Sequence, residues 1–167
     1  KSVPLSETAS TENAYIYGVF SIKAPKAWLA MKGHQSMAFV LTCADKKKYT
    51  IGFRIEKPLQ VVKVSPAKCS LTEIIFADAD GLILSSKPVP AGMFTDKTFV
   101  AGKAYYLGDY FAVSENTMSY PYISTTWRIV DTKNNYIQTT QDMYSAYPNF
   151  RNFATVPLPV LPSSEWR

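Results

Sequence analysis

The sequence has little of the chemistry on which most metal sites and hydrolases depend. Its only histidine is His34, which follows a glycine in a predicted surface loop, and it has two cysteines among 167 residues. One histidine and two cysteines are too few for most zinc sites and for any site built from several histidines. No serine lies in a Gly-x-Ser-x-Gly motif, and the isolated glycines form neither a phosphate loop nor a dinucleotide fingerprint. The sequence therefore predicts no metal, no cofactor and no Ser-His-Asp triad.

Long hydrophobic runs and strong charge are also missing. No stretch approaches the roughly 20 consecutive apolar residues that a transmembrane helix needs. Lys and Arg total 18 and Asp and Glu total 13, which gives a formal net charge of +5. The only basic run, residues 46–48, follows Asp45 as in a solvated turn, and no basic stripe interleaves with aromatic residues. The composition therefore predicts no binding to nucleic acid.

What the chain does contain is the pattern of a β protein. Apolar residues make up 47% of the chain, enough for the core of one domain. Period-2 alternation is clearest over residues 48–56, and the preceding turn predicts a hairpin with residues 37–43. Further strand-like segments are residues 15–22, 59–64, 69–77, 82–84, 98–100, 103–113 and 125–130. Gly108, inside one of them, predicts a bulge or a close approach of two backbones.

Short strands separated by turn signals predict an all-β fold, an antiparallel β-sandwich of about seven to nine strands. A small β-barrel is the alternative. One short C-terminal helix is predicted over residues 138–147, with Thr139 or Thr140 as its cap and Pro148 at its end.

The chain divides into three parts by composition. Residues 1–13 are polar and without periodicity, which predicts a tether or disordered arm. Residues 14–154 are expected to form the sandwich. Residues 155–167 are proline-rich and predict an extended tail that packs along the domain or hangs free.

Cys43 and Cys69 lie 26 positions apart, each in a strand-like segment. Their spacing matches no Cys-x-x-Cys metal or redox motif. A disulfide that links two strands is therefore favoured over two buried thiols, and it predicts an oxidising compartment.

Carboxylates offer the remaining catalytic arrangement. Glu73 and Asp109 interrupt otherwise apolar strands, and they could support glycoside hydrolysis if they faced each other about 5 Å or 6.5–9.5 Å apart. An outward-facing position on a sheet is the simpler interpretation of each. Asp78 and Asp80 resemble the start of a calcium loop, but position 12 would be Val89 instead of glutamate, so a plain turn is expected.

Aromatic residues are more numerous than one face of a sheet can hold. Segment 103–113 carries rings at alternating and at adjacent positions, and more rings follow it: Tyr105, Tyr106, Tyr110, Phe111, Tyr120, Tyr122, Trp127, Tyr136, Tyr144 and Tyr147. Exposed Tyr and Trp are enriched at protein interfaces and can stack on sugar rings. The candidate binding surface consists of Tyr105, Tyr110, Trp127 and Tyr136. The alternative is internal packing, with a helix or the proline-rich tail covering the second face.

Three segments resemble bacterial envelope lipoproteins of uncharacterised function: VSPAKCSLTEIIF, FVAGKAYYLGDY and a late helix ending in YPNF. In the second segment, residues 101–108 correspond to a Pro-Gly-Lys-Tyr-Tyr-Leu-Gly pattern. The resemblance covers roughly residues 50–150. It implies a sandwich similar to transthyretin-like or carboxypeptidase-regulatory domains, export from the cytoplasm, and a lipidated cysteine just before Lys1. It supplies no catalytic residues.

These observations predict a non-enzymatic envelope lipoprotein that is periplasmic or tethered to the outer membrane. The domain is expected to bind another protein, in a secretion or envelope assembly or as an inhibitor or immunity protein. Two alternatives stay open: a carbohydrate-binding or adhesin-like sandwich, and a hydrolase that uses two carboxylates.

Overall fold

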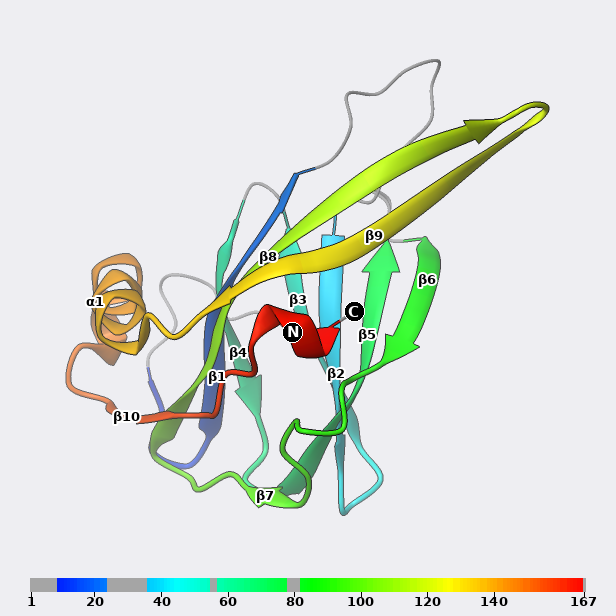
Figure 1. Ribbon diagram of the computed structural model, residues 1–167. Helices are drawn as coiled ribbons and strands as arrows, with labels where there is room; N and C mark the ends of the chain where they lie inside the picture. The colour runs from blue at the N-terminus through cyan, green and yellow to red at the C-terminus, as the bar shows by residue number, and fades with distance from the viewer. Residues whose placement is uncertain (1–8, 24–35, 55–56, 78–81, 167) are drawn as a thin grey trace.

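The computed structural model describes residues 9–23, 36–54, 57–77 and 82–166 (Figure 1). The features predicted at His34 and at the Asp78 turn lie outside these residues. The described strands are β1 (Ala14–Lys23), β2 (Ser36–Cys43), β3 (Lys48–Arg54), β4 (Leu59–Val64), β5 (Lys68–Ala77), β6 (Ile83–Pro88), β7 (Lys97–Thr98), β8 (Lys103–Ser119), β9 (Tyr122–Lys133) and β10 (Ala154–Pro157). The helices are α1 (Tyr136–Ala146) and the short 3-10 turns η1 (Pro148–Phe150) and η2 (Ser163–Trp166).

The strands form two sheets of five, which confirms the predicted β-sandwich; no closed barrel forms in the described part of the chain. Sheet A has the order β10-β8-β1-β4, with β9 also paired to β8, and sheet B has the order β3-β2-β5-β6, with β7 paired to β5. The hairpin expected between residues 37–43 and 48–56 is the β2–β3 pair. One detail differs from the predicted antiparallel arrangement. Sheet A is mixed, because β1 and β10 both run parallel to β8.

The main core lies between the inner faces of the two sheets. Phe53 of sheet B packs against Phe20 of sheet A and against Phe39 of its own sheet, and each of the three side chains is at most 2% exposed. The period-2 pattern of the sequence places these residues inward, because alternate side chains of a strand share one face.

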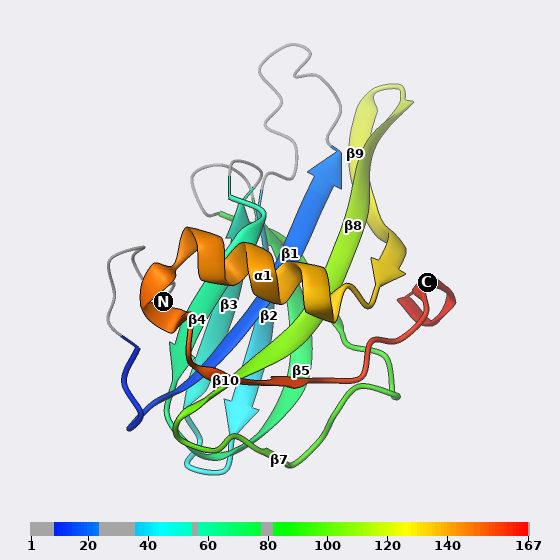
Figure 2. The same cartoon turned by 90° about the vertical axis from the view of Figure 1, so that its left-hand side faces the viewer.

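A second core lies on the outer face of sheet A, where α1 crosses the strands (Figure 2). Tyr15, Tyr17 and Tyr106 point to this side and are fully buried against Met143 and Phe150. Sheet A is therefore buried on both faces where α1 covers it, which explains the adjacent aromatic residues Tyr105 and Tyr106 in β8.

Helix α1 begins earlier than the sequence indicated. Its N-cap residue is Asn135, and no side chain caps it. Thr139 and Thr140, the predicted caps, instead lie within the helix, and their side chains are buried. Thr140 Oγ1 is 2.6 Å from the Tyr17 hydroxyl of β1. Both threonines lie within the helix because their side chains contact sheet A, and the local sequence does not reveal this contact.

The predicted disulfide is confirmed. Cys43 of β2 and Cys69 of β5 are directly opposite partners in the antiparallel pair and are bonded through their sulfurs. Both are almost completely buried. The bond therefore joins two adjacent strands of sheet B.

The C-terminal segment belongs to the fold instead of hanging free. Strand β10 pairs with the start of β8, and Leu158 and Trp166 both enter the main core. At the other end, Ala9 packs against the core under α1, and the Ser10 backbone N–H donates to the Tyr15 hydroxyl at 3.0 Å. The remainder of the predicted N-terminal arm, residues 1–8, lies outside the described residues.

Candidate interaction surface

The most prominent surface feature is the hairpin of β8 and β9, which projects beyond the rest of the sandwich (Figure 1). Strand β1 accompanies β8 only as far as the Lys23–Val113 pair, whereas the β8–β9 pairing continues to Ser119 and Tyr122. Residues 114–119 therefore extend about 20 Å beyond the last partner in β1, at roughly 3.4 Å per residue. We call residues 114–127 the distal hairpin.

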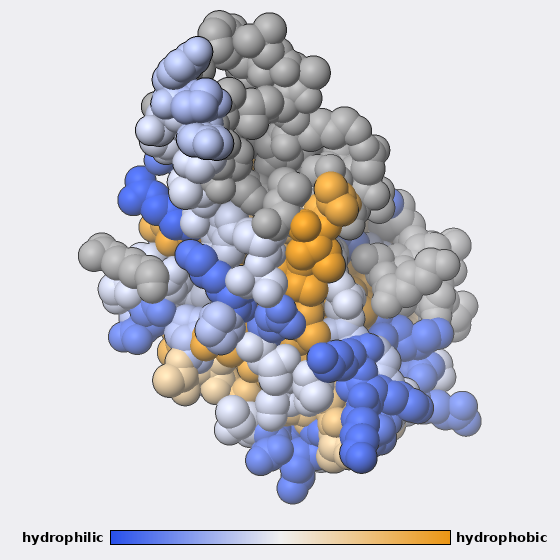
Figure 3. All heavy atoms as spheres, turned by 90° about the vertical axis from the view of Figure 1, so that its right-hand side faces the viewer, coloured by the Kyte–Doolittle hydropathy of each residue, from blue (hydrophilic) through white to orange (hydrophobic). Residues whose placement is uncertain are grey.

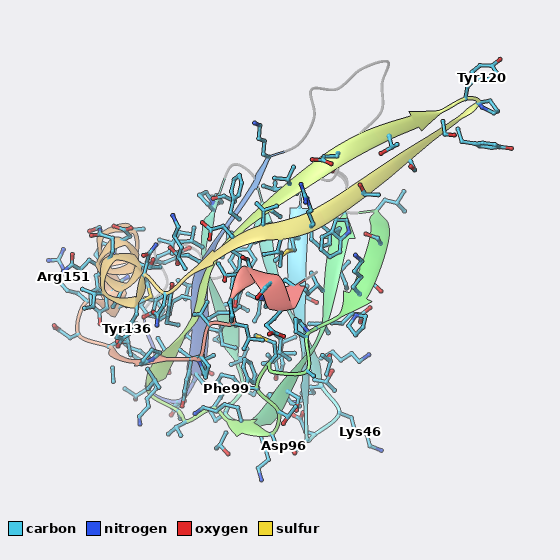
Figure 4. All side chains as sticks on the ribbon, in the orientation of Figure 1. Lys46, Asp96, Phe99, Tyr120, Tyr136 and Arg151 are labelled. Carbon is cyan, nitrogen blue, oxygen red and sulfur yellow. A yellow bond between two sulfur atoms is a disulfide. The ribbon has the colours of Figure 1, made fainter. Side chains whose placement is uncertain are left out.

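Two tyrosines are exposed at its end. Tyr120 is 95% exposed and Tyr122 is 76% exposed, the highest values among the large hydrophobic residues of the described chain. They flank Pro121, which follows a cis peptide bond. Figure 4 shows Tyr120 at the far end of the hairpin, pointing away from the body. We call residues 119–122 the hairpin tip.

The tip is free of charge. Residues 116–126 contain no Asp, Glu, Lys or Arg, although charged residues make up 19% of the chain. The nearest charges are Glu115 and Arg128, whose side chains pair with each other at 3.8 Å on the exposed surface. The hairpin therefore ends in aromatic and small polar side chains, with its flanking charges already balanced.

Three of the four predicted surface aromatics lie elsewhere, in the core. Tyr105 packs edge-on against Phe99, with ring centroids 4.7 Å apart, and its hydroxyl accepts the Val100 backbone N–H. Tyr110 lies between Phe39 and Trp166. Their exposed fractions are 3% and 2%. The expectation that they form a surface is therefore wrong, because Phe99 packs on Tyr105, and Phe39 and Trp166 pack on Tyr110.

Trp127 is also buried, at the base of the distal hairpin. Its ring stacks on Phe76, its indole N–H donates to Ser85 Oγ at 2.5 Å, and Lys87 Nζ lies 4.6 Å from its ring centroid. These contacts tie the hairpin to β5 and β6 of sheet B. Trp127 thus holds the hairpin in place.

Tyr136 is the only one of the four that reaches the surface. It is half-buried at the start of α1, its hydroxyl lies 2.5 Å from Thr155 Oγ1, and its ring lies 5.8 Å from that of Tyr106. It lines an open cleft of about 540 Å³ between α1 and β10.

The two candidate catalytic carboxylates are not brought together. Asp109 lies on the outer face of sheet A, where it accepts hydrogen bonds from Tyr106 at 2.7 Å and Thr139 at 3.0 Å. Glu73 follows the side-chain alternation of β5 to the outer face of sheet B, opposite to core residues such as Ile74. Both sheets lie between them, so they cannot flank one glycosidic bond. Asp109 instead joins β8 to α1.

The shifted ionisable groups are structural tyrosines. Burial, the largest cause in each case, raises the pKa values of Tyr17, Tyr106, Tyr110 and Tyr147 above the ordinary value of tyrosine. The carboxylate of Asp109 raises the pKa of Tyr106 and Tyr110 further. These hydroxyls stay protonated at neutral pH, and those of Tyr106 and Tyr110 donate hydrogen bonds to Asp109 and to the Leu107 carbonyl oxygen.

Within the described ranges, no three His, Cys, Asp or Glu side chains come together to hold a metal ion. Among the residues that the structure describes, no helix is both long and apolar enough to cross a membrane. Viewed from the β6 side, the surface has a hydrophobic band bordered by hydrophilic residues (Figure 3). Leu82 and Ile83, at the start of β6, are 65% and 60% exposed. They adjoin residues 78–81, which lie outside the described chain, and we assign them no site.

The sequence does contain a signal for the hairpin tip. Tyr120 and Tyr122 were among the surplus aromatics, but the two strands predicted on either side, residues 103–113 and 125–130, stopped short of them. Tyr120-Pro121 is a turn signal, and the segments on both sides of it contain Ser and Thr, which permits both strands to continue up to it.

Comparison of the chain with protein-family models, with curated protein sequences and with solved structures gives no match in any of the three. Function is therefore inferred from the chain's own geometry.

Proposed function

We propose that this protein is a non-enzymatic binding module of the bacterial cell envelope, and that the hairpin tip is its contact with a protein partner. The observation that carries the proposal is the pair of exposed rings, Tyr120 and Tyr122, at the end of a hairpin that extends beyond both sheets.

The composition of the tip favours a protein partner. Tyrosine is enriched among the residues that dominate binding energy, because a rigid ring buries much area at a small entropic cost. The tip has no charge whose desolvation would oppose binding. A convex tip of this kind fits a concave partner site lined with uncharged groups.

The hairpin is held ready for binding. The contacts of Trp127 with Phe76 and Ser85 fix its base on sheet B, and β1 fixes β8 up to Val113. A preorganised element loses little conformational entropy when it binds, so more of the contact energy appears as affinity.

The envelope location is part of the proposal and has two supports. The Cys43–Cys69 disulfide is typical of an oxidising compartment. The resemblance to envelope lipoproteins adds export and an N-terminal lipid anchor. Labelling cells that express the complete gene product with a fatty-acid analogue tests the anchor, and a product found reduced in the cytoplasm would contradict the location.

Site-specific photo-cross-linking in native envelopes tests the contact. A photoreactive phenylalanine at position 120 should give one dominant protein adduct, and the same group at position 82 should give none of that adduct. Position 82 is a matched control, because Leu82 is also exposed but lies at the start of β6. Adducts from position 120 only to lipid, or the same adduct from both positions, would count against a protein contact at the tip.

A further inference from the structure

The open cleft beside Tyr136 carries a second inference, independent of the hairpin tip. Its lining comes from the loop before α1, the first turn of α1 and strand β10: Asn134, Asn135, Tyr136, Ile137, Gln138 and Pro157. None of these side chains is charged. The volume of about 540 Å³ lies within the range of roughly 300–1,000 Å³ common for small-molecule sites.

Three side-chain amides line the cleft. In each, one group is hydrogen-bonded within the protein and the other is without a partner in the described structure. Asn135 Nδ2 donates to Asp109 Oδ2 at 3.1 Å, and Gln138 Nε2 donates to Asp142 Oδ1 at 2.9 Å. Each leaves its amide oxygen without a partner in the described structure. Asn134 is held in the opposite sense, because its Oδ1 accepts the Tyr136 backbone N–H at 3.3 Å and its NH₂ group stays open. The cleft thus offers two acceptors and one donor group.

The Tyr136 ring is fixed as a platform. Its hydroxyl bonds to Thr155 of β10, and the ring packs on Tyr106 of β8. Because these contacts already fix the ring, a ligand that packs on it causes little further loss of side-chain entropy. Ile137, which is 73% exposed, and Pro157 add apolar surface on either side.

The charges next to the cleft disfavour an anionic ligand. The carboxylates of Asp109 and Asp142 lie directly behind two of the amides, so an anionic ligand would meet like charge. The two carboxylates already accept hydrogen bonds from those amides, and no lining side chain carries a positive or negative charge to pair with an ionic ligand. An uncharged ligand with many hydroxyl groups satisfies the open donors and acceptors and stacks on the ring.

We propose that this cleft binds a neutral carbohydrate, with Tyr136 as the stacking platform and Asn134, Asn135 and Gln138 as its hydrogen-bonding groups. The cleft and the hairpin tip lie on different sides of the molecule, as the positions of Tyr136 and Tyr120 show (Figure 4). The domain would thus hold a glycan at one site and a protein at the other.

Titration of the isotope-labelled protein, followed by NMR, tests the proposal. The probes are a neutral glycan panel that includes the tetramers of β-1,4-linked glucose and N-acetylglucosamine, with tetragalacturonate as the anionic comparison. A neutral glycan should shift the backbone signals of residues 134–138 and 157, and tetragalacturonate should shift them less. No shift there with any neutral member at millimolar concentration, or a stronger response to the anion, overturns the proposal.

Variants separate stacking from a general effect on the helix. Tyr136→Ala should weaken glycan binding at least tenfold, whereas Tyr144→Ala should change it less than twofold. Tyr144 is a matched control, because it is half-buried on the same helix and its hydroxyl is hydrogen-bonded, but it does not line the cleft. Equal weakening by both variants would overturn the assignment.

A surface variant keeps the test decisive if Tyr136→Ala fails to fold. Gln138 is exposed, so Gln138→Ala should fold and should weaken binding by roughly 3–10-fold, the value of one hydrogen bond. Unchanged affinity in this variant would show that the Gln138 amide does not bind the glycan. Substitution of Tyr120 and Tyr122 should leave glycan binding intact, so failure of the protein-binding proposal would leave this one standing.

Discussion

A Cβ atom added to Gly18 of β1 would lie 2.7 Å from the carbonyl oxygen of Gly108 in β8. The β1–β8 register shifts at this point, between the Tyr17–Tyr106 and Val19–Asp109 pairs. Gly108 has a φ of 134°, a backbone conformation that favours glycine. The bulge or close approach that Gly108 suggested in the sequence is therefore confirmed, and it lies between the two strands at the centre of sheet A.

Gly18→Ala should lower the free energy of unfolding by about 3 kcal/mol, because the methyl group meets backbone that cannot rotate away. Gly52→Ala is the matched control, since nothing lies within 4 Å of its added Cβ. It should leave stability unchanged or raise it by up to about 1 kcal/mol. Urea denaturation of both variants measures the difference in the free energy of unfolding. Equal values would contradict the close approach of β1 and β8 at Gly18.

Asp109→Ala should loosen α1 from sheet A. Asp109 accepts hydrogen bonds from Tyr106, Thr139 and Asn135. Its loss removes the acceptor of the Thr139 hydroxyl and leaves the Tyr106 hydroxyl only the longer bond to the Lys133 carbonyl oxygen. We expect a loss of about 3 kcal/mol and faster hydrogen exchange in α1 than in sheet B.

The control for this prediction is Asp142→Ala, which removes an exposed carboxylate from the same helix and one bond to Gln138. It should cost less than about 1 kcal/mol. Uniform exchange over the whole domain in Asp109→Ala would show that Asp109 does not act on the helix in particular.

The double variant Cys43→Ala, Cys69→Ala should lose about 3.5 kcal/mol relative to the oxidised protein in the chain-entropy model. The bond closes a loop across a sequence separation of 26 residues. Denaturation with and without a reductant measures the effect. A reductant should destabilise the natural protein and leave the double variant unchanged, and insensitivity of both would contradict a structural role of the bond.

Alkaline pH should destabilise the fold. The buried hydroxyls of Tyr17, Tyr106, Tyr110 and Tyr147 have raised pKa values in the folded state, whereas unfolded tyrosine titrates near 10. The contribution of these hydroxyls to the free energy of unfolding is complete below pH 10. It is lost as the pH rises toward their pKa values in the folded state, because only the unfolded state releases these protons in that range.

Absorbance at rising pH checks this prediction. The four buried rings of Tyr17, Tyr106, Tyr110 and Tyr147 should ionise only together with unfolding. Ionisation of these four rings with the fold retained would contradict their burial.

The sequence predicted the sandwich, the disulfide and the Gly108 irregularity, because each depends on local alternation, spacing or backbone freedom. It did not predict the parallel neighbours of β8 or the burial of Tyr105 and Tyr110, which follow from how distant segments pack. The start of α1 was misplaced for the same reason, since Thr139 and Thr140 bond to sheet A. For the binding surface, the alternation of side chains along a strand indicated more rings than one face can hold. Only the packing showed that Tyr120 and Tyr122 are the most exposed of them.

The most direct test of the account compares what three forms of the exported protein capture from cross-linked native envelopes, quantified by mass spectrometry. The forms are the natural protein, the tip variant Tyr120→Ser, Tyr122→Ser, and the control Leu82→Ser, Ile83→Ser, which removes a similar exposed apolar pair. Because all four side chains are exposed, both variants should fold with stability within about 0.5 kcal/mol of the natural protein. A stoichiometric protein partner should be retained by the control and reduced by roughly 30-fold or more in the tip variant, as expected when a residue worth about 2 kcal/mol is removed. Retention of that partner by the tip variant, or its loss from the control alone, would show that the hairpin tip is not the binding site.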